Sequence, residues 1–147
     1  MTGKTDFTEQ EWELVREGPP TAALMAMTAQ KGGSFRESWA LAKSYTEARQ
    51  AHGESELLDA LVGEKPDLKR YKSAEELESQ GLGRLREAVA LLEQKATADD
   101  VAAYRKFALD VAQRVAAAHK EGGQPVSDAE RAAIELVEAS LYPSGST

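Results

Sequence analysis

The two histidines, His52 and His119, belong to the residue type most often used in metal binding and proton transfer. Each lies shortly before a glycine at the expected C-terminus of a helix, where the helix dipole favours a cationic side chain. A zinc site would need further nitrogen or sulfur ligands at suitable spacing. The chain has no HxxxH motif, no ExxH motif and no cysteine. We therefore interpret both histidines as helix-terminal residues and not as metal ligands.

Acidic residues occur in close pairs, an arrangement used in di-metal sites and in general acid–base catalysis. The pairs are Glu75-Glu76-x-Glu78, Asp99-Asp100 and Glu135-x-x-Glu138. Di-metal helical bundles use Glu-x-x-His on facing helices, and a catalytic acid needs an apolar pocket. Most of these carboxylates fall in expected first turns of helices, where the dipole attracts negative charge. The sequence therefore nominates no catalytic, cofactor-binding or metal-binding residue and implies no cofactor.

Two glycine loops share one pattern, an alanine-rich run, a Gly-Gly stop and a Ser-x-x-Glu start. They are Gln30 to Glu37 and Lys120 to Glu130. Neither contains the phosphate-binding patterns GxxxxGK[ST] or GxGxxG. The second loop offers oxygen atoms that a hard cation would accept, from Glu121, Ser127, Asp128 and Glu130, although not at EF-hand spacing. A metal-ion-binding stress protein that uses residues 121–130 is therefore the alternative function.

The paired segments Ser34-Phe35-Arg36-Glu37 and Ser127-Asp128-Ala129-Glu130 resemble the tellurite-resistance TerB-like helical domains. In that family the second helix of each unit typically opens in this way after a glycine loop. Glu121 matches the acidic residue often found before the loop glycine, whereas Lys31 departs from it. The resemblance implies a compact all-helical fold associated with stress, metal or envelope complexes, and it implies no catalytic residue.

Helix start and stop signals divide the chain into seven expected helices. Starts are the capping boxes at Thr8, Ser34, Ser73 and Ser127 and a shorter variant at Thr97, and stops include Gly18-Pro19-Pro20. The expected helices are 9–17, 21–29, 35–51, 56–62, 74–96, 98–121 and 128–141. We expect a kink or break at Gly81 and Gly83, and an antiparallel hairpin across Ala96-Thr97. The prediction is an all-α bundle with a possible internal helix-loop-helix pseudo-repeat.

The expected core combines a buried second helix with amphipathic stripes on the others. Residues 22–27 are apolar on all sides, which is typical of a buried helix. Along the sixth helix, apolar residues recur at three- and four-residue steps from Val101 onward and form an amphipathic stripe. The expected aromatic core anchors are Trp12, Trp39, Tyr45, Tyr104 and Phe107. The third helix should place Phe35, Trp39, Ala42 and Tyr45 near one face. The seventh should bury Ala133, Leu136, Val137 and Leu141.

Length and charge bound the class of protein. A chain of 147 residues with 41% apolar and 29% charged residues fits a single helical domain, residues 1–147, with 1–6 and 143–147 frayed. The net charge of −7 disfavours nucleic acid, and the cluster Lys65, Lys69, Arg70 and Lys72 is interpreted as a solvated face. We expect no membrane insertion, a polar N-terminus that is not a signal peptide, and a cytoplasmic location.

The residues favour a non-enzymatic function for this chain. We expect a protein-interaction or stress-associated module whose partner is another protein or a second copy of the chain, with a homodimer as one possibility. An enzyme would need a deep pocket with convergent polar groups.

Overall fold

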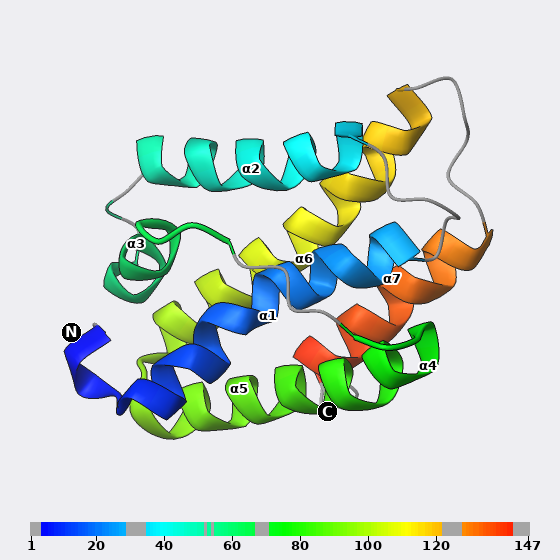
Figure 1. The fold of residues 1–147 in the computed structure, drawn as a ribbon. Helices are drawn as coiled ribbons and strands as arrows, with labels where there is room; N and C mark the ends of the chain where they lie inside the picture. Colours follow the sequence, from blue (N-terminus) through cyan, green and yellow to red (C-terminus); the bar gives the residue numbers. More distant parts are fainter. Residues whose placement is uncertain are drawn as a thin grey trace.

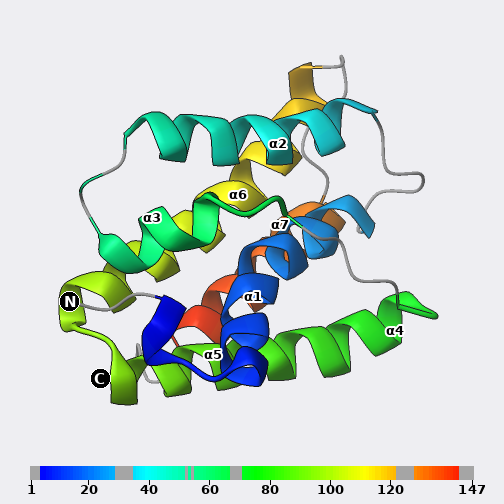
Figure 2. The same cartoon turned by 60° about the vertical axis from the view of Figure 1, so that its left-hand side comes forward.

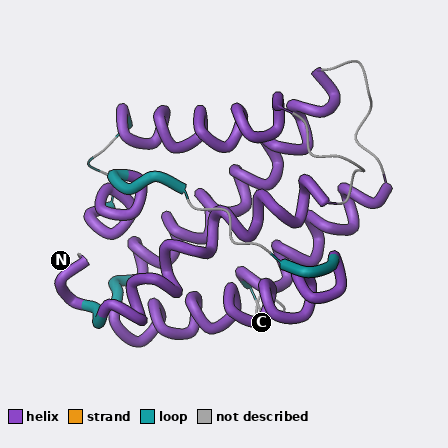
Figure 3. Tube along the Cα trace, viewed as in Figure 1, coloured by secondary structure: helices purple, strands orange, loops and turns teal. Residues whose placement is uncertain are grey.

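The computed structural model describes residues 4–28, 35–51, 53, 55–66, 71–121 and 128–142. All regular structure in these ranges is helical, with no strand (Figures 1 and 3). The elements are η1 (Lys4–Asp6), α1 (Glu9–Thr28), α2 (Phe35–Gln50), α3 (Glu56–Val62), α4 (Ala74–Glu76), η2 (Leu77–Gly81), α5 (Leu82–Lys95), α6 (Ala98–Glu121) and α7 (Asp128–Leu141). Because α4, η2 and α5 run on as one helix, the described residues hold six helices beside the η1 turn. The all-α class is confirmed, but the count of seven helices is not.

The difference in helix number arises at Gly18-Pro19-Pro20, where a stop was predicted and α1 instead continues. Proline has no N–H group and therefore removes a hydrogen bond from the helix interior. Pro19 leaves the carbonyl of Val15 without its donor four residues on. The Tyr104 hydroxyl of α6 donates a hydrogen bond to this carbonyl at 2.7 Å. A donor from another helix thus replaces the missing one, so the prediction of two separate helices was wrong.

Gly18 makes room for this contact. A Cβ atom at this position would lie 1.9 Å from the Tyr104 hydroxyl oxygen and 3.1 Å from Cδ1 of Leu85 on α5. Gly18 is buried, as are both prolines, and Tyr104 is completely buried. The Gly-Pro-Pro sequence is therefore a contact surface for α5 and α6 in the middle of the molecule.

The helix α1 is the central element of the bundle. It packs against α5, α6 and α7, while α2 lies on the outside and packs mainly on α6 and α3 (Figures 1 and 2). The chain reverses direction at Ala96-Thr97, as predicted, but both views show α5 and α6 diverging from this corner. The predicted apolar run 22–27 is buried except for Leu24, which is half-buried. The predicted stripe on α6 is buried throughout, from Val101 to Ala118.

The predicted capping box at the start of α1 is confirmed. The Glu11 backbone N–H donates to Oγ1 of Thr8 at 3.1 Å, and the Thr8 N–H donates to Oε1 of Glu11 at 2.9 Å. Phe7 and Trp12, which flank this box, pack with ring centroids 5.8 Å apart and form a hydrophobic staple. The same Glu11 oxygen accepts from Nζ of Lys95 at 2.6 Å. This cap therefore also fastens the end of α5 to the start of α1.

The other described caps follow the same chemistry with different partners. Ser73 accepts from the backbone N–H of Glu76 at 3.0 Å, and Thr97 accepts from that of Asp100 at 3.1 Å. The Asp100 carboxylate also accepts from the hydroxyl of Ser55, the cap of α3, at 2.6 Å. Asp100 and Ser55 are both buried, so this pair joins the starts of α3 and α6. Ser34 and Ser127 lie outside the described residues, and the pseudo-repeat is therefore not confirmed.

The glycines of the fifth predicted helix do not break it. The chain stays helical across Gly81 and Gly83, and the irregularity is the π-helical segment η2. A Cβ atom at Gly81 would lie 3.1 Å from both Leu77 and Thr21 side chains. Gly81 therefore lets η2 lie close to α1 at this level.

The N-terminal residues that the structure describes are ordered in a helical turn. Residues 1–6 were expected to fray, but Lys4–Asp6 form the η1 turn, which contacts α3. At the other end, Leu141 is the last helical residue, and its carbonyl accepts from Nε of Arg105 at 2.8 Å. Residues 143–147 lie outside the described ranges. Leu136, predicted to be buried, is partly exposed.

Replacing Gly18 with alanine should destabilise the fold, because the new methyl group would collide with the Tyr104 hydroxyl. We expect a loss of about 1–3 kcal/mol in the free energy of unfolding, measured by urea denaturation followed by circular dichroism. The matched control is Gly83→Ala, where the nearest atom lies 3.8 Å away at the end of the Arg86 side chain. This variant should gain about 0.5–1 kcal/mol. Equal effects at both positions would contradict the close contact.

Stability should also depend on the charge of Glu11. The hydrogen bond from the Lys95 ammonium, followed by that from the Thr8 N–H, lowers the pKa of this carboxyl below its ordinary value of 4.5. A lowered folded-state pKa adds stability above the unfolded-state pKa, and this is lost as the pH falls through the folded-state value. Glu11→Gln should therefore unfold at lower urea than wild type at neutral pH, and the difference should disappear in acid. Glu13→Gln, an exposed position on the same helix, is the control.

Candidate functional site

The outer helix α2 presents a large apolar side chain to solvent. Trp39 is 56% exposed, so its prediction as a core anchor was wrong. The other four predicted aromatic anchors are buried. Trp39 precedes Leu41 by two residues, which places the two side chains about 200° apart around the helix. Because Leu41 and Tyr45 occupy the buried side of α2, Trp39 faces outward, and Ala42 is also exposed.

A groove with a volume of about 370 Å³ runs beside Trp39, between α2 and α6. Its α2 wall consists of Trp39, Ala40, Lys43 and Glu47, and its α6 wall of Arg114, Ala117 and Ala118. The Lys43 ammonium lies 5.0 Å from the centroid of the Trp39 ring, a cation–π contact. The α6 side of the groove is shallow, because two of its three lining residues are alanines with short side chains. We call this part the tryptophan end of the groove.

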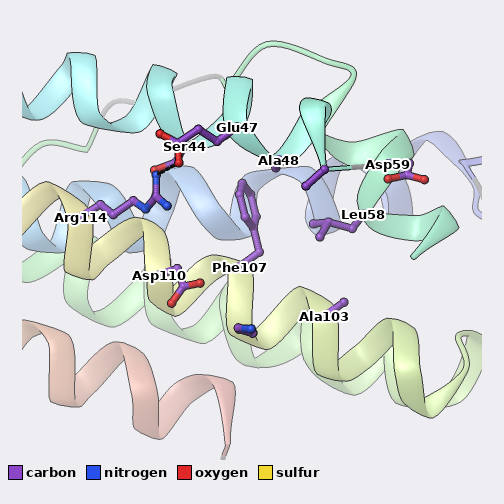
Figure 4. Close-up of a pocket in the computed structure, with 11 residues that line it drawn as sticks. Ser44, Glu47, Ala48, Leu58, Asp59, Ala103, Phe107, Asp110 and Arg114 are labelled. Atoms are coloured by element: carbon purple, nitrogen blue, oxygen red, sulfur yellow. Dashed lines mark hydrogen bonds and ion pairs between the residues drawn. The ribbon is translucent and has the colours of Figure 1, made fainter. Parts of the chain in front are cut away.

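A second hollow of about 290 Å³ continues along the same two helices to α3. We call this part the polar end (Figure 4). Its lining residues are Ser44, Glu47, Ala48, Ala51, Leu58, Asp59, Ala103, Lys106, Phe107, Asp110 and Arg114. The Phe107 ring contributes apolar surface and packs edge-on against Tyr45, with centroids 5.2 Å apart. The two ends share Glu47 and Arg114.

Charges of both signs line the polar end. Glu47 and Arg114 form an ion pair at 2.7 Å that links α2 to α6, and both side chains are more than one-third exposed, so the pair alone adds little stability. Lys106 and Asp110 lie one turn apart on α6, and no ion pair of either occurs within the described residues. The Asp59 carboxylate accepts from the Gly53 backbone N–H at 3.0 Å. The groove therefore combines apolar surface with a locally balanced set of charges.

The groove favours binding over covalent chemistry. The hydroxyl group of the groove, on Ser44, donates to the Ala40 carbonyl of its own helix at 2.9 Å, and within the described residues no hydrogen bond joins it to the lining carboxylates of Glu47, Asp59 and Asp110. Nucleophilic catalysis would require a base within hydrogen-bond reach. Both hollows are open surface grooves, whereas small-molecule sites usually enclose most of their ligand.

The residues considered for metal binding do not converge in the described part of the chain. His52, the side chains of His119 and Glu121, and residues 122–127 lie outside it. Asp128 is exposed, while Glu130 is completely buried in the first turn of α7. The described residues hold no group of three or more histidine and carboxylate side chains that would hold a metal ion. The alternative metal site at residues 121–130 thus stays a prediction.

The remaining charged residues considered for function lie apart from the groove. Of the paired carboxylates, Asp100 is buried against Ser55 and Glu76 is half-buried, while the others are exposed. Within the basic cluster, Lys65 and Lys72 are exposed, and positions 69 and 70 lie outside the described residues.

Sequence reasoning missed the polar groove residues on α6. Their signal is the run Lys106, Asp110 and Arg114 at four-residue spacing, immediately beside the buried stripe. Such a run also fits an ordinary solvated helix face. The helix α2, which turns this face into a groove, could not be assigned to that flank from spacing alone.

Comparisons with known proteins return no match, whether to protein-family models, to curated proteins or to solved structures. The resemblance to TerB-like domains is therefore untested. Within the described residues, none of the helices has the length and apolar character required to span a membrane.

The different environments of the two tryptophans can be measured directly. Trp12 is 4% exposed and its indole N–H donates to Glu64, whereas Trp39 is 56% exposed. Trp12→Phe should therefore leave emission at long wavelength that acrylamide quenches efficiently. Trp39→Phe should leave blue-shifted emission that is quenched poorly. Indistinguishable quenching of the two variants, with circular dichroism showing both folded, would contradict the outward position of Trp39.

Proposed function

We propose that this chain is a non-enzymatic interaction domain whose binding face is the groove between α2 and α6. The observation that carries the proposal is the 56% exposure of Trp39 at one end of this groove. Tryptophan is among the residues that contribute most to protein–protein binding energy, especially beside a pocket. The partner we propose is another protein that inserts an apolar side chain between Trp39 and α6.

The shape and charge of the tryptophan end support this partner class. Ala117 is exposed and Ala118 lies next to it, so a partner helix can approach α6 without displacing long side chains. Lys43 and the Glu47–Arg114 pair form a polar rim around this apolar surface. An apolar centre with a polar rim is the usual anatomy of a protein interface. An association with stress-related complexes, which the TerB-like pattern implies, is part of the same proposal.

A photo-crosslinking amino acid at position 117 tests the location of the binding face. The control site is position 90, an exposed alanine on α5, which lies at the edge of the bundle opposite α2 (Figure 1). In cells of the source organism, position 117 should give a discrete adduct with another protein, and position 90 should not. Equal labelling from both sites would contradict a specific face.

The captured protein must then bind through Trp39. Purified and titrated calorimetrically, it should bind the Trp39→Ala variant at least tenfold more weakly than wild type, because loss of a central anchor costs about 2 kcal/mol or more. Leu136→Ala is the matched control, since this partly exposed apolar residue lies on α7, outside both groove ends. It should leave the affinity unchanged. Equal affinities of wild type and Trp39→Ala would reject the proposal.

A further inference from the structure

An exposed stripe follows α6 along the polar end of the groove. It consists of residues at three- and four-residue steps, all exposed or half-buried: Ala102, Ala103, Lys106, Asp110 and Gln113. This spacing places them on one side of the helix. The opposite side of α6 holds Tyr104, Ala108 and Val111, which are completely buried in the core. The stripe is therefore a surface that the described part of the bundle leaves uncovered.

Lys106 and Asp110 lie at the middle of this stripe, one helical turn apart. They carry opposite charges, and within the described residues no ion pair satisfies either of them. A stripe with one positive and one negative charge at this spacing is complementary to itself when a second copy is turned by a two-fold rotation. Such isologous contacts are the commonest way in which identical chains associate.

We propose that two copies of this chain associate through the exposed stripe of α6, which packs antiparallel against the same stripe of the second copy. This inference rests on the proposed function as an interaction domain. Lys106 of each copy then pairs with Asp110 of the other. The two-fold axis passes level with residue 108. The contact buries part of the polar end of the groove and forms two equivalent charge pairs.

The size of the neighbouring side chains fits this register. Pairing position 106 with position 110 sets Ala103 opposite Gln113. A short side chain thus faces a long one, and the same pair recurs on the other side of the axis. Alternation of small and large residues lets two helices approach to about 8–10 Å.

Electrostatics favours a second copy as the occupant of this stripe. Each chain carries a net charge of −7, so most of its surface repels another copy. The centre of the stripe is an exception, because Lys106 and Asp110 cancel and a two-fold arrangement aligns opposite charges. On α6 the tryptophan end begins at Arg114, six residues or roughly 9 Å from the axis, and it extends to Ala118, roughly 15 Å from the axis. Trp39 itself lies on α2, outside the stripe, so its side chain stays open to the partner proposed above.

Charge exchange at positions 106 and 110 tests the pairing. Sedimentation velocity across the micromolar range should show a dimer of wild type, and monomers of Lys106→Asp and of Asp110→Lys, whose facing charges repel. An equimolar mixture of these two variants should again give a dimer, because each variant then meets the opposite charge at both positions. The double variant Lys106→Asp with Asp110→Lys should also dimerise. Lys72→Asp, at an exposed position outside both groove ends, should not change association.

Each outcome decides the proposal, with circular dichroism confirming that every variant is folded. A wild type that stays monomeric overturns it, as does a dimer that both single variants retain or a mixture that does not associate. The proposed function is tested separately, through the affinity of the captured protein for the Trp39→Ala variant. A monomeric wild type that still binds its partner through Trp39 would overturn the dimer and leave the interaction function intact. A charge-dependent dimer without any Trp39-dependent partner would give the opposite result.

Discussion

The hydrogen bond from the Tyr104 hydroxyl to the Val15 carbonyl fixes the central helix against α6. Burial raises the pKa of Tyr104 well above its ordinary value, so the hydroxyl keeps the proton that it donates. A buried carbonyl without any donor would cost about 1–3 kcal/mol. Pro19 creates this need, and Gly18 opens the space that satisfies it. Together these groups fix the position of α1 along the axis of α6.

The outer face of the molecule follows from this central packing. Because α1 contacts the buried side of α6, α2 packs along an adjoining flank and has little contact with α1. Leu41 and Tyr45 hold the inner side of α2 in the core, and the helical repeat then turns Trp39 outward. The groove exists because α2 and α3 cover one flank of α6 and leave the neighbouring flank open to solvent. Its two ends differ in chemistry because α6 contributes the charged residues Lys106 and Asp110 at the polar end and Ala117 and Ala118 at the tryptophan end.

Local signals predicted the helices well, whereas long-range contacts decided the exceptions. The Thr8–Glu11 box needs only neighbouring residues, so its sequence was sufficient. Pro19 and Pro20 carry an equally clear local signal, but a hydroxyl 89 residues away from Val15 overrides it. The prediction of a buried Trp39 was wrong because hydrophobicity alone does not fix the side of a helix, and Trp39 lies about 200° around α2 from the buried Leu41. The groove was invisible to sequence reasoning because no local pattern states which flank of α6 receives α2.

The separation between Val15 and Tyr104 has a consequence for how the chain acquires its fold. Gly18 of the central helix is synthesised well before its contacts, because Leu85 on α5 follows it by 67 residues and Tyr104 on α6 comes later still. Contacts between such distant segments slow folding, because the intervening chain must be ordered before they form. During synthesis the apolar run from Ala22 to Met27 therefore waits without its partners. Until α6 emerges from the ribosome, this apolar segment lacks the helix that covers it in the folded protein and is therefore prone to aggregation.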